Sequence, residues 1–284
     1  MAYSNMKEIL EKARKGHYAI PAFNIVNYLT AQAIVDVAEE LSSPVILQTS
    51  ASTAKQFGIY KLSEMLIPIA KRAEVPVVIH LDHCSDTQFI KECIDAGWSS
   101  VMIDASTYSL EENIRLTKEV VEYAKDKGVT VEGELGSIVG VEDDIAVEEG
   151  KQRLADVDNC RTYLEATNID AFAPAIGTAH GLYKGEPKLD FHLLEQIKKI
   201  SLCPLVIHGG TGLASEVFKK LISLGGTKIN ISTAVKITYC ESISEYINEH
   251  PNENNPLKLD KYATEKVKQL SSEYIKIFGS ENHA

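Results

Sequence analysis

The chain has 284 residues, of which 44% are hydrophobic and 24% charged, and its formal net charge at pH 7 is −11. This length and composition are typical of one globular unit, and they are sufficient for one large core. The acidic balance argues against a general nucleic-acid surface, because a phosphate backbone repels a negatively charged protein. It does not exclude a small anionic substrate, since local N–H donors and a metal can outweigh the global charge.

The sequence shows no signal for secretion or for membrane insertion. Its first residues, MAYSNMKE, contain no apolar segment of a signal peptide, and no apolar stretch is long enough to span a bilayer. The five cysteines are scattered and form no C-x-x-C pair, which is typical of reduced thiols. We therefore expect a cytoplasmic protein that has no disulfide framework and binds neither nucleic acid nor membrane.

The first half of the chain alternates between helical and strand patterns. Apolar residues at helical spacing predict helices over residues 6–15, 30–41, 60–72, 86–96 and 110–127. Apolar and β-branched runs predict strands over residues 17–24, 45–49, 77–85, 100–104 and 129–134. The strand at residues 77–85 (VVIHLDHCS) is apolar apart from His80 before an Asp-His pair, a pattern typical of a parallel strand that is buried on both faces.

The second half continues the alternation after one long interruption. Residues 135–150 hold three glycines and five acids without periodicity, so we expect a long mobile loop, which in a compact domain is usually functional. Strands are predicted over residues 169–173, 204–208 and 227–231. Helices are predicted over residues 157–167, 191–200, 214–224, from 233 onward, and 260–278, with a polar connector at 251–256.

Eight predicted strands that alternate with helices favour a (β/α)8 TIM barrel that spans residues 1–284 as a single domain. The alternative is a doubly wound open sheet. That fold would predict a G-x-G-x-x-G turn after the first strand, and the residues that follow it, 23–27 (FNIVN), contain none.

The carboxyl ends of all barrel strands converge on one face, so the residues that follow each strand are candidates for a common site. They include three histidines at different strand ends, and these suit a zinc ion with an open fourth position. Asp104 and Glu134 are candidates to orient the imidazoles, and His80 is expected to support them. The alternative is that the histidines are separate hydrogen-bonded residues. The candidate residues in chain order are Asp82, His83, Asp104, Glu134, His180, His208 and Asn230.

Two glycine-bearing turns flank this face, at residues 177–181 (GTAHG) and 208–212 (HGGTG). Glycine lets the backbone approach a ligand closely. Barrels often bind phosphate between the loops after strands seven and eight, where a helix N-terminus offers N–H groups. The turn at 208–212 and the segment at 230–233 therefore predict a phosphate site, unless the glycines only make tight turns.

These residues, in this order, resemble the class II, zinc-dependent ketose-bisphosphate aldolases, and within them the tagatose/fructose-bisphosphate aldolase branch. The resemblance covers nearly the whole chain. The motifs that carry it are residues 18–24 (YAIPAFN), 80–83 (HLDH), 131–136 (VEGELG), 175–183 (AIGTAHGLY), 205–210 (LVIHGG) and 228–233 (KINIST). Several motifs in one order are far more specific than any single motif.

Residue by residue, the resemblance implies a complete site. His83, His180 and His208 match the zinc ligands, and Asp82 matches the proton-transferring acid/base. Glu142, in the loop expected to be mobile, matches an acid proposed to shuttle the carbon-bound proton. The segments that match the dihydroxyacetone phosphate site contain Gly181, Gly209, Gly210, Thr211, Asn230, Ile231, Ser232 and Thr233.

The resemblance implies reversible cleavage of tagatose or fructose 1,6-bisphosphate to dihydroxyacetone phosphate and glyceraldehyde 3-phosphate. In this reaction zinc (Zn2+) polarises the ketone oxygen, Asp82 takes the proton of the C4 hydroxyl, and the C3–C4 bond breaks. The resemblance also implies a cytoplasmic enzyme of carbohydrate metabolism that forms a homo-oligomer, a dimer or a tetramer. A need for a monovalent cation or for a non-catalytic partner subunit stays open.

Some positions depart from the usual pattern of the branch and leave the distal sugar open. Lys236, one helical turn into the last predicted barrel helix, is expected either to pair with a distal phosphate or to be solvated. The departures are Cys84 in place of His or Gly, Ala105 in place of Gly, Ser232 in place of the Asp of some members, and Ala234 in place of an acid.

Two alternatives to a bisphosphate aldolase stay open. One is an aldolase of the same fold that retains the dihydroxyacetone phosphate half but uses another acceptor aldehyde. The other is a family member that has lost catalysis and serves as a regulatory subunit. Retention of Asp82 and all three histidines argues against the second alternative.

Overall fold

A computed structural model describes residues 2–142, 145–147, 153–183 and 185–284. Its centre is a closed barrel of parallel strands in the order β1-β11-β10-β8-β5-β4-β3-β2. The predicted (β/α)8 barrel is therefore confirmed, and the alternative of an open sheet is wrong. The barrel strands are β1 (Ile20–Asn24), β2 (Val45–Ser50), β3 (Val77–Cys84), β4 (Ser100–Ile103), β5 (Thr130–Leu135), β8 (Ala171–Pro174), β10 (Leu205–Ile207) and β11 (Gly226–Ile231).

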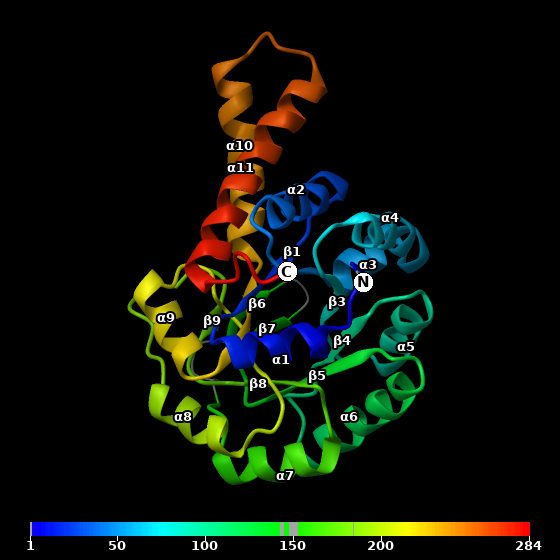
Figure 1. Cartoon of the computed structure of the whole chain (residues 1–284), viewed down its shortest axis with the longest axis vertical. Helices are drawn as coiled ribbons and strands as arrows, with labels where there is room; N and C mark the ends of the chain where they lie inside the picture. The colour runs from blue at the N-terminus through cyan, green and yellow to red at the C-terminus, as the bar shows by residue number, and fades with distance from the viewer. Residues whose placement is uncertain (1, 143–144, 148–152, 184) are drawn as a thin grey trace.

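Helices surround the barrel (Figure 1). They are α1 (Met6–Gly16), α2 (Tyr28–Glu40), α3 (Ala51–Phe57), α4 (Ile59–Arg72), α5 (Thr87–Asp95), α6 (Leu110–Lys125), α7 (Val157–Thr167), α8 (Phe191–Ile200), α9 (Ser215–Ser223), α10 (Thr233–Glu249) and α11 (Pro256–Phe278). Each helix predicted from the sequence is present. The short α3 was not predicted, because its two turns are too short to show a clear period.

The last helix begins earlier than predicted. The helix was expected over residues 260–278, after the connector at 251–256, but α11 already starts at Pro256. Asn255 caps it, since its side chain accepts a hydrogen bond from the backbone N–H of Leu257. Proline in the first turn costs no helical hydrogen bond. Together α10 and α11 form a helical hairpin that projects beyond the barrel (Figure 1).

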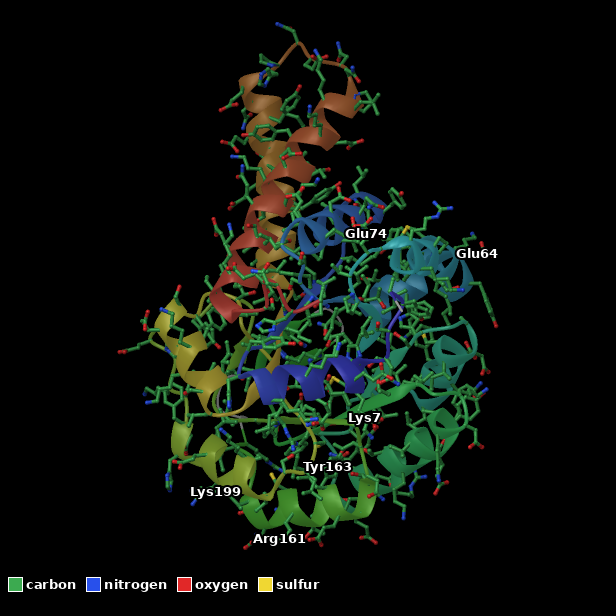
Figure 2. The ribbon with its side chains drawn as sticks, viewed as in Figure 1. Lys7, Glu64, Glu74, Arg161, Tyr163 and Lys199 are labelled. Carbon is green, nitrogen blue, oxygen red and sulfur yellow. The ribbon has the colours of Figure 1, made fainter. Side chains whose placement is uncertain are left out.

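The outer face of the barrel is apolar and covered by the helices, whose other sides carry the charges. Tyr163 of α7 lies inside this layer and is fully buried, whereas Arg161 of the same helix and Lys199 of α8 lie at the periphery (Figure 2). This amphipathic arrangement is what the helical period in the sequence predicts. Among the described residues, no helix combines the length and apolarity that a membrane crossing requires.

Helix α1 closes the amino end of the barrel and crosses the middle of the ring in Figure 1. Met6, Leu10 and Ala13 are completely buried there against inward-facing residues of the strands. The strand residues in this cluster are Ile20, Ala22, Ile46, Val78, Ala171, Ala173 and Val206. The N-terminal segment therefore acts as the capping helix that its sequence predicts.

The segment that was predicted to be a long loop contains two strands. β6 (Val139–Glu142) pairs antiparallel with β7 (Ile145–Val147) and parallel with β9 (Ala179–His180). The prediction of a loop without structure is corrected here, because strands this short show no periodicity and one partner lies far along the chain. Gly140 has a φ of 115°, and a Cβ there would lie 2.2 Å from the carbonyl oxygen of His180, so only glycine fits.

Candidate metal centre

Three histidines from separate strand ends meet at the carboxyl end of the barrel. His83 is on β3, His180 is on β9, and His208 follows β10. The ring centroids are 4.5 Å apart for His83 and His208, 4.8 Å for His83 and His180, and 6.1 Å for His180 and His208. All three are buried, and their potential ligand atoms lie within 4.8 Å of one another. The structure thus brings together the three histidines that the sequence predicted to converge.

A bulge at the end of β3 places two consecutive side chains in the same site. In a regular strand, Asp82 and His83 would point to opposite faces. Here the pairing of β3 with β4 shifts register between Leu81 and Cys84, and His83 has a φ of 40°. A left-handed backbone at a non-glycine residue costs about 1–3 kcal/mol and is concentrated at functional sites. The bulge therefore turns His83 toward the other histidines while Asp82 stays in the barrel.

A carboxylate holds the imidazole of His83 in one orientation. Its Nδ1 lies 2.8 Å from Oδ2 of Asp104, whose Oδ1 accepts hydrogen bonds from the backbone N–H and the hydroxyl of Ser106. Burial acts to raise the pKa of Asp104, but the contacts with His83 and Ser106 outweigh it and hold that pKa well below its usual value. An ionised Asp104 fixes the proton on Nδ1, so Nε2 of His83 is the atom suited to a metal.

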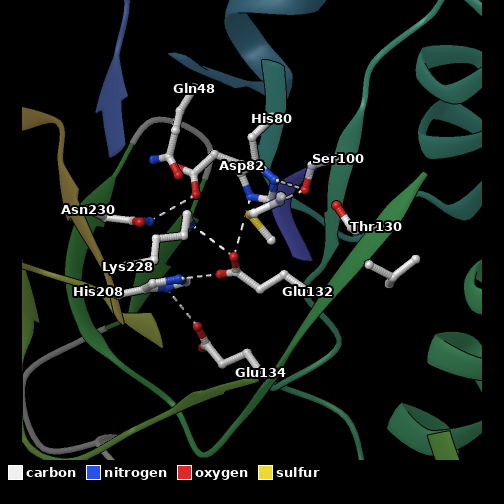
Figure 3. Close-up of polar contacts among 12 residues, drawn as sticks. Gln48, His80, Asp82, Ser100, Thr130, Glu132, Glu134, His208, Lys228 and Asn230 are labelled. Atoms are coloured by element: carbon white, nitrogen blue, oxygen red, sulfur yellow. Dashed lines mark hydrogen bonds and ion pairs between the residues drawn. The ribbon is translucent and has the colours of Figure 1, made fainter. Parts of the chain in front are cut away.

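His208 is held by two glutamates of β5. Its Nε2 lies 2.7 Å from Oε1 of Glu132, and its Nδ1 lies 3.1 Å from Oε2 of Glu134 (Figure 3). Because Glu132 accepts the Nε2 proton, Nδ1 is the ring atom that remains to bind a metal. Glu134 was predicted to stand near the metal, whereas Glu132 was not singled out as a site residue.

A buried ion pair lies beneath His208 and was also not predicted. The ammonium of Lys228 is 2.9 Å from Oε2 of Glu132, and both side chains are completely buried. The signal for both residues is the strand period of two, since Glu132 shares a face of β5 with Glu134, and Lys228 shares a face of β11 with Asn230. Charged residues within buried strands are rare enough to have marked these positions.

Asp82 lies beside the histidines with both carboxylate oxygens hydrogen-bonded. Oδ2 accepts from the amide of Asn24 at 2.9 Å, and Oδ1 accepts from the amide of Asn230 at 3.1 Å. Gln48 donates in turn to the amide oxygen of Asn24. Burial acts to raise the pKa of Asp82, but the nearby charges of His83 and Lys228 outweigh it and lower that pKa to about 2. Asp82 is therefore a carboxylate with a fixed orientation.

The predicted phosphate segments lie next to this cluster. Gly209 has a φ of 67°, and a Cβ there would lie 2.3 Å from the carbonyl oxygen of Ala179. The hydroxyl of Thr211 accepts from the backbone N–H of Ala234 at 3.2 Å, which joins the loop after β10 to the start of α10. The hydroxyl of Ser232, which precedes α10, is buried and has no hydrogen-bond partner within the described structure. The remaining predicted positions, Gly181, Gly210, Asn230, Ile231 and Thr233, belong to the same segments.

The structure gives less support for the predicted roles of two residues, Glu142 and Lys236. Glu142 is the last residue of β6, but its side chain lies outside the described residues. Lys236 lies in the first turn of α10 and is half-buried. Ala105, which follows β4, is completely buried, so its methyl group is accommodated there.

The sequence matches the family model described as fructose-bisphosphate aldolase class-II over residues 4–283. It is 43% identical to a fructose-bisphosphate aldolase of Geobacillus stearothermophilus, with 100% of this chain and 99% of the relative covered. It is 42% identical to a fructose-bisphosphate aldolase of Staphylococcus aureus, with both chains covered completely.

Solved structures show the same similarity. The YdjI aldolase from Escherichia coli K12 superposes with a TM-score of 0.86 at 32% identity, with 99% of each chain covered. A structure described as a putative fructose-1,6-biphosphate aldolase from Coccidioides immitis superposes with a TM-score of 0.90 at 29% identity, with 98% of this chain and 97% of that chain covered. The chain therefore belongs to the class II fructose-bisphosphate aldolase family, and it is an aldolase of the lyase class.

Proposed function

We propose that this protein reversibly cleaves fructose 1,6-bisphosphate to dihydroxyacetone phosphate and glyceraldehyde 3-phosphate, with zinc held by His83, His180 and His208. The observation that carries the proposal is the three-histidine cluster next to an ionised Asp82, in a chain of this family. The two curated relatives described above are named for this reaction.

The donor set fits zinc. Imidazole nitrogens are preferred zinc ligands, and three protein ligands leave the fourth position for substrate. The carboxylates on Nδ1 of His83 and Nε2 of His208 fix the tautomers that direct the other ring nitrogens to a common point. A zinc ion bound there would act as a Lewis acid on the ketone of the substrate.

Asp82 is placed to move the proton of the C4 hydroxyl. As a carboxylate it accepts this proton when the C3–C4 bond breaks, and it returns the proton in the synthetic direction. Asn24 and Asn230 donate to its two oxygens, so the carboxylate cannot rotate away from the substrate. We assign the proton transfer at carbon to Glu142, because β6 reaches the site through its pairing with β9.

The start of α10 and the turn after β10 are proposed to hold the phosphate of dihydroxyacetone phosphate. A helix N-terminus offers N–H groups to an anion, and the N-cap residue of α10, Ser232, makes no side-chain cap that competes for them. The unpartnered hydroxyl of Ser232 and the close backbone at Gly209 and Gly210 support this assignment. Gly181, Thr211, Asn230, Ile231 and Thr233 complete the proposed site, with Lys236 toward the distal phosphate.

We further propose that the enzyme acts in the cytoplasm as a homo-oligomer. All five cysteines are unpaired, which suits a reducing compartment. Ile247 and Leu257 on the projecting helical hairpin are 53% and 73% exposed, and an assembly through this hairpin would cover them. Light scattering after size-exclusion chromatography measures the mass of the assembly and reveals whether a partner subunit is required for it.

The decisive experiment compares the cleavage of fructose and tagatose 1,6-bisphosphates with and without a chelator, in buffers with and without potassium. We expect cleavage of fructose 1,6-bisphosphate that is lost with the chelator and restored by zinc. The ratio of kcat/KM for the two sugars gives the preference at C4. A zinc-loaded protein that cleaves neither sugar would contradict the proposed substrate and favour another acceptor aldehyde.

A further inference from the structure

Lys228 is the only lysine or arginine that is buried among the residues the structure describes. Its ammonium lies inside the barrel, 2.9 Å from Oε2 of Glu132, and neither side chain has any exposed area. Removing two charges from water is costly, and an apolar pair of the same shape is often equally stable. Stability of the core is therefore a weak explanation for the presence of this pair.

Glu132 connects this lysine to the histidine cluster. Its Oε1 accepts from Nε2 of His208 at 2.7 Å, and its Oε2 lies 3.6 Å from Nε2 of His80 (Figure 3). His80 is itself held by a contact of 2.7 Å between its Nδ1 and the hydroxyl of Ser100. The network joins β3, β4, β5 and β11 to the loop after β10, so it sets the position of His208 relative to most of the barrel.

We propose that Lys228 and Glu132 are positioning residues for the metal, a role that rests on the proposed zinc site. Glu132 keeps the proton of His208 on Nε2, which directs Nδ1 to the metal and makes the imidazole a stronger donor. Lys228 compensates the charge of Glu132, so that the carboxylate stays ionised within the barrel.

The charges around the site support this role. Four buried carboxylates, those of Asp82, Asp104, Glu132 and Glu134, surround the three histidines. Zinc would add two positive charges and Lys228 adds one, and these charges offset negative charge on the carboxylates. Lys228 is paired with Glu132, which reaches the metal only through His208. The other three carboxylates then face the metal, its ligands or the substrate.

The test replaces the ion pair by a neutral pair of similar shape. In Glu132→Gln/Lys228→Met, the amide oxygen of the glutamine still accepts from Nε2 of His208, but the negative charge is lost. A matched control is Lys7→Met/Asp170→Asn, which neutralises the ion pair of 3.0 Å at the opposite end of the barrel. Zinc affinity is measured on metal-free protein by competition with a chromophoric chelator, and folding is measured by thermal unfolding in chelator.

We expect the neutral pair to fold and to bind zinc about 10–100-fold more weakly, while the control binds zinc as the parent does. A folded double variant with the zinc affinity of the parent would overturn the proposal, because the ion pair would then be purely structural. Aldol cleavage is assayed separately. A parent that binds zinc without cleavage overturns the proposed reaction, while the zinc affinities still decide the role of Lys228.

Glu132→Gln alone is the second variant, used if the double variant does not fold. A single amide oxygen can serve either Lys228 or His208, so we expect zinc binding at least as weak as in the double variant. Nitrogen NMR of the histidines should show that His208 no longer holds one tautomer. An unchanged tautomer together with unchanged zinc affinity would overturn the proposal.

Discussion

The two ends of the barrel interior differ sharply in chemistry. At the amino end, α1 closes the barrel with Met6, Leu10 and Ala13, which pack in a cluster of apolar strand residues. At the carboxyl end, the interior is filled by histidines, carboxylates, amides and one lysine. The comparison shows that the amino end contributes hydrophobic stability and the carboxyl end holds charges that reduce it.

Individual strands pass from the chemistry of the amino end to that of the carboxyl end within a few residues. On the inward face of β3, apolar Val78 is followed at steps of two by His80 and then Asp82. On β5, which β4 separates from β3 in the barrel wall, the inward face passes from Thr130 to Glu132. Because alternate residues share a face, each strand carries part of both ends. A mutation at one end should therefore affect either stability or chemistry, and this separation can be tested.

The largest expected effect is that of His208→Ala at the carboxyl end. Removing this nitrogen should abolish both zinc binding and cleavage, because loss of a direct ligand exceeds the roughly 100-fold cost of losing an outer partner. Metal analysis after dialysis and a cleavage assay measure the two losses. His192→Ala, at an exposed position on α8, is the control. Stoichiometric zinc in His208→Ala would show that His208 is not a ligand.

The next effect separates proton transfer from metal binding. Asp82→Ala should keep zinc but lower kcat by about 10²–10⁴-fold, the usual contribution of a positioned acid or base. Single-turnover cleavage with the zinc-loaded variant measures the loss directly. If Asp82→Ala turned over at the rate of the parent, another group would have to move the C4 hydroxyl proton.

At the amino end, Leu10→Ala should reduce stability without affecting the chemistry. Leu10 is completely buried, and a Leu→Ala change of this kind costs about 2–5 kcal/mol. Urea unfolding measures the loss, and kcat/KM and zinc affinity are measured at a temperature where the variant is folded. A large fall in kcat/KM of the folded variant would mean that the two ends are coupled.

The smallest expected effect is a pH dependence of zinc binding. Burial and His83 act to lower the pKa of His208, but the contacts with Glu132 and Glu134 outweigh them and raise it to about 8 in the metal-free protein. Because its pKa is raised in the fold, protonated His208 stabilises the metal-free protein below about pH 6.5. This stabilisation is lost as the pH rises through 8.

Zinc must displace this proton, so its affinity should rise about tenfold per pH unit from pH 6 to about 8. His83, whose pKa is also raised, adds to the slope. Chelator competition between pH 6 and 9 measures it. Affinity that is flat over this range would show that neither imidazole is protonated before zinc binds.

The sequence alone determined the barrel and most of the histidine site. The helical and strand periods are local, and the convergence of parallel strands at one face follows from the fold class. This convergence predicts one common site for Asp82, His83, Asp104, Glu134, His180 and His208.

The tertiary structure alone decided how these residues are supported. The sheet of β6, β7 and β9 joins segments that are distant in sequence, and no local period reveals such pairing. The bulge that turns His83 depends on the register between β3 and β4. The ion pair of Glu132 and Lys228 forms across the barrel, between strands separated by 96 residues of sequence. Long-range pairing and register are properties of the packed fold, because they depend on which surfaces meet.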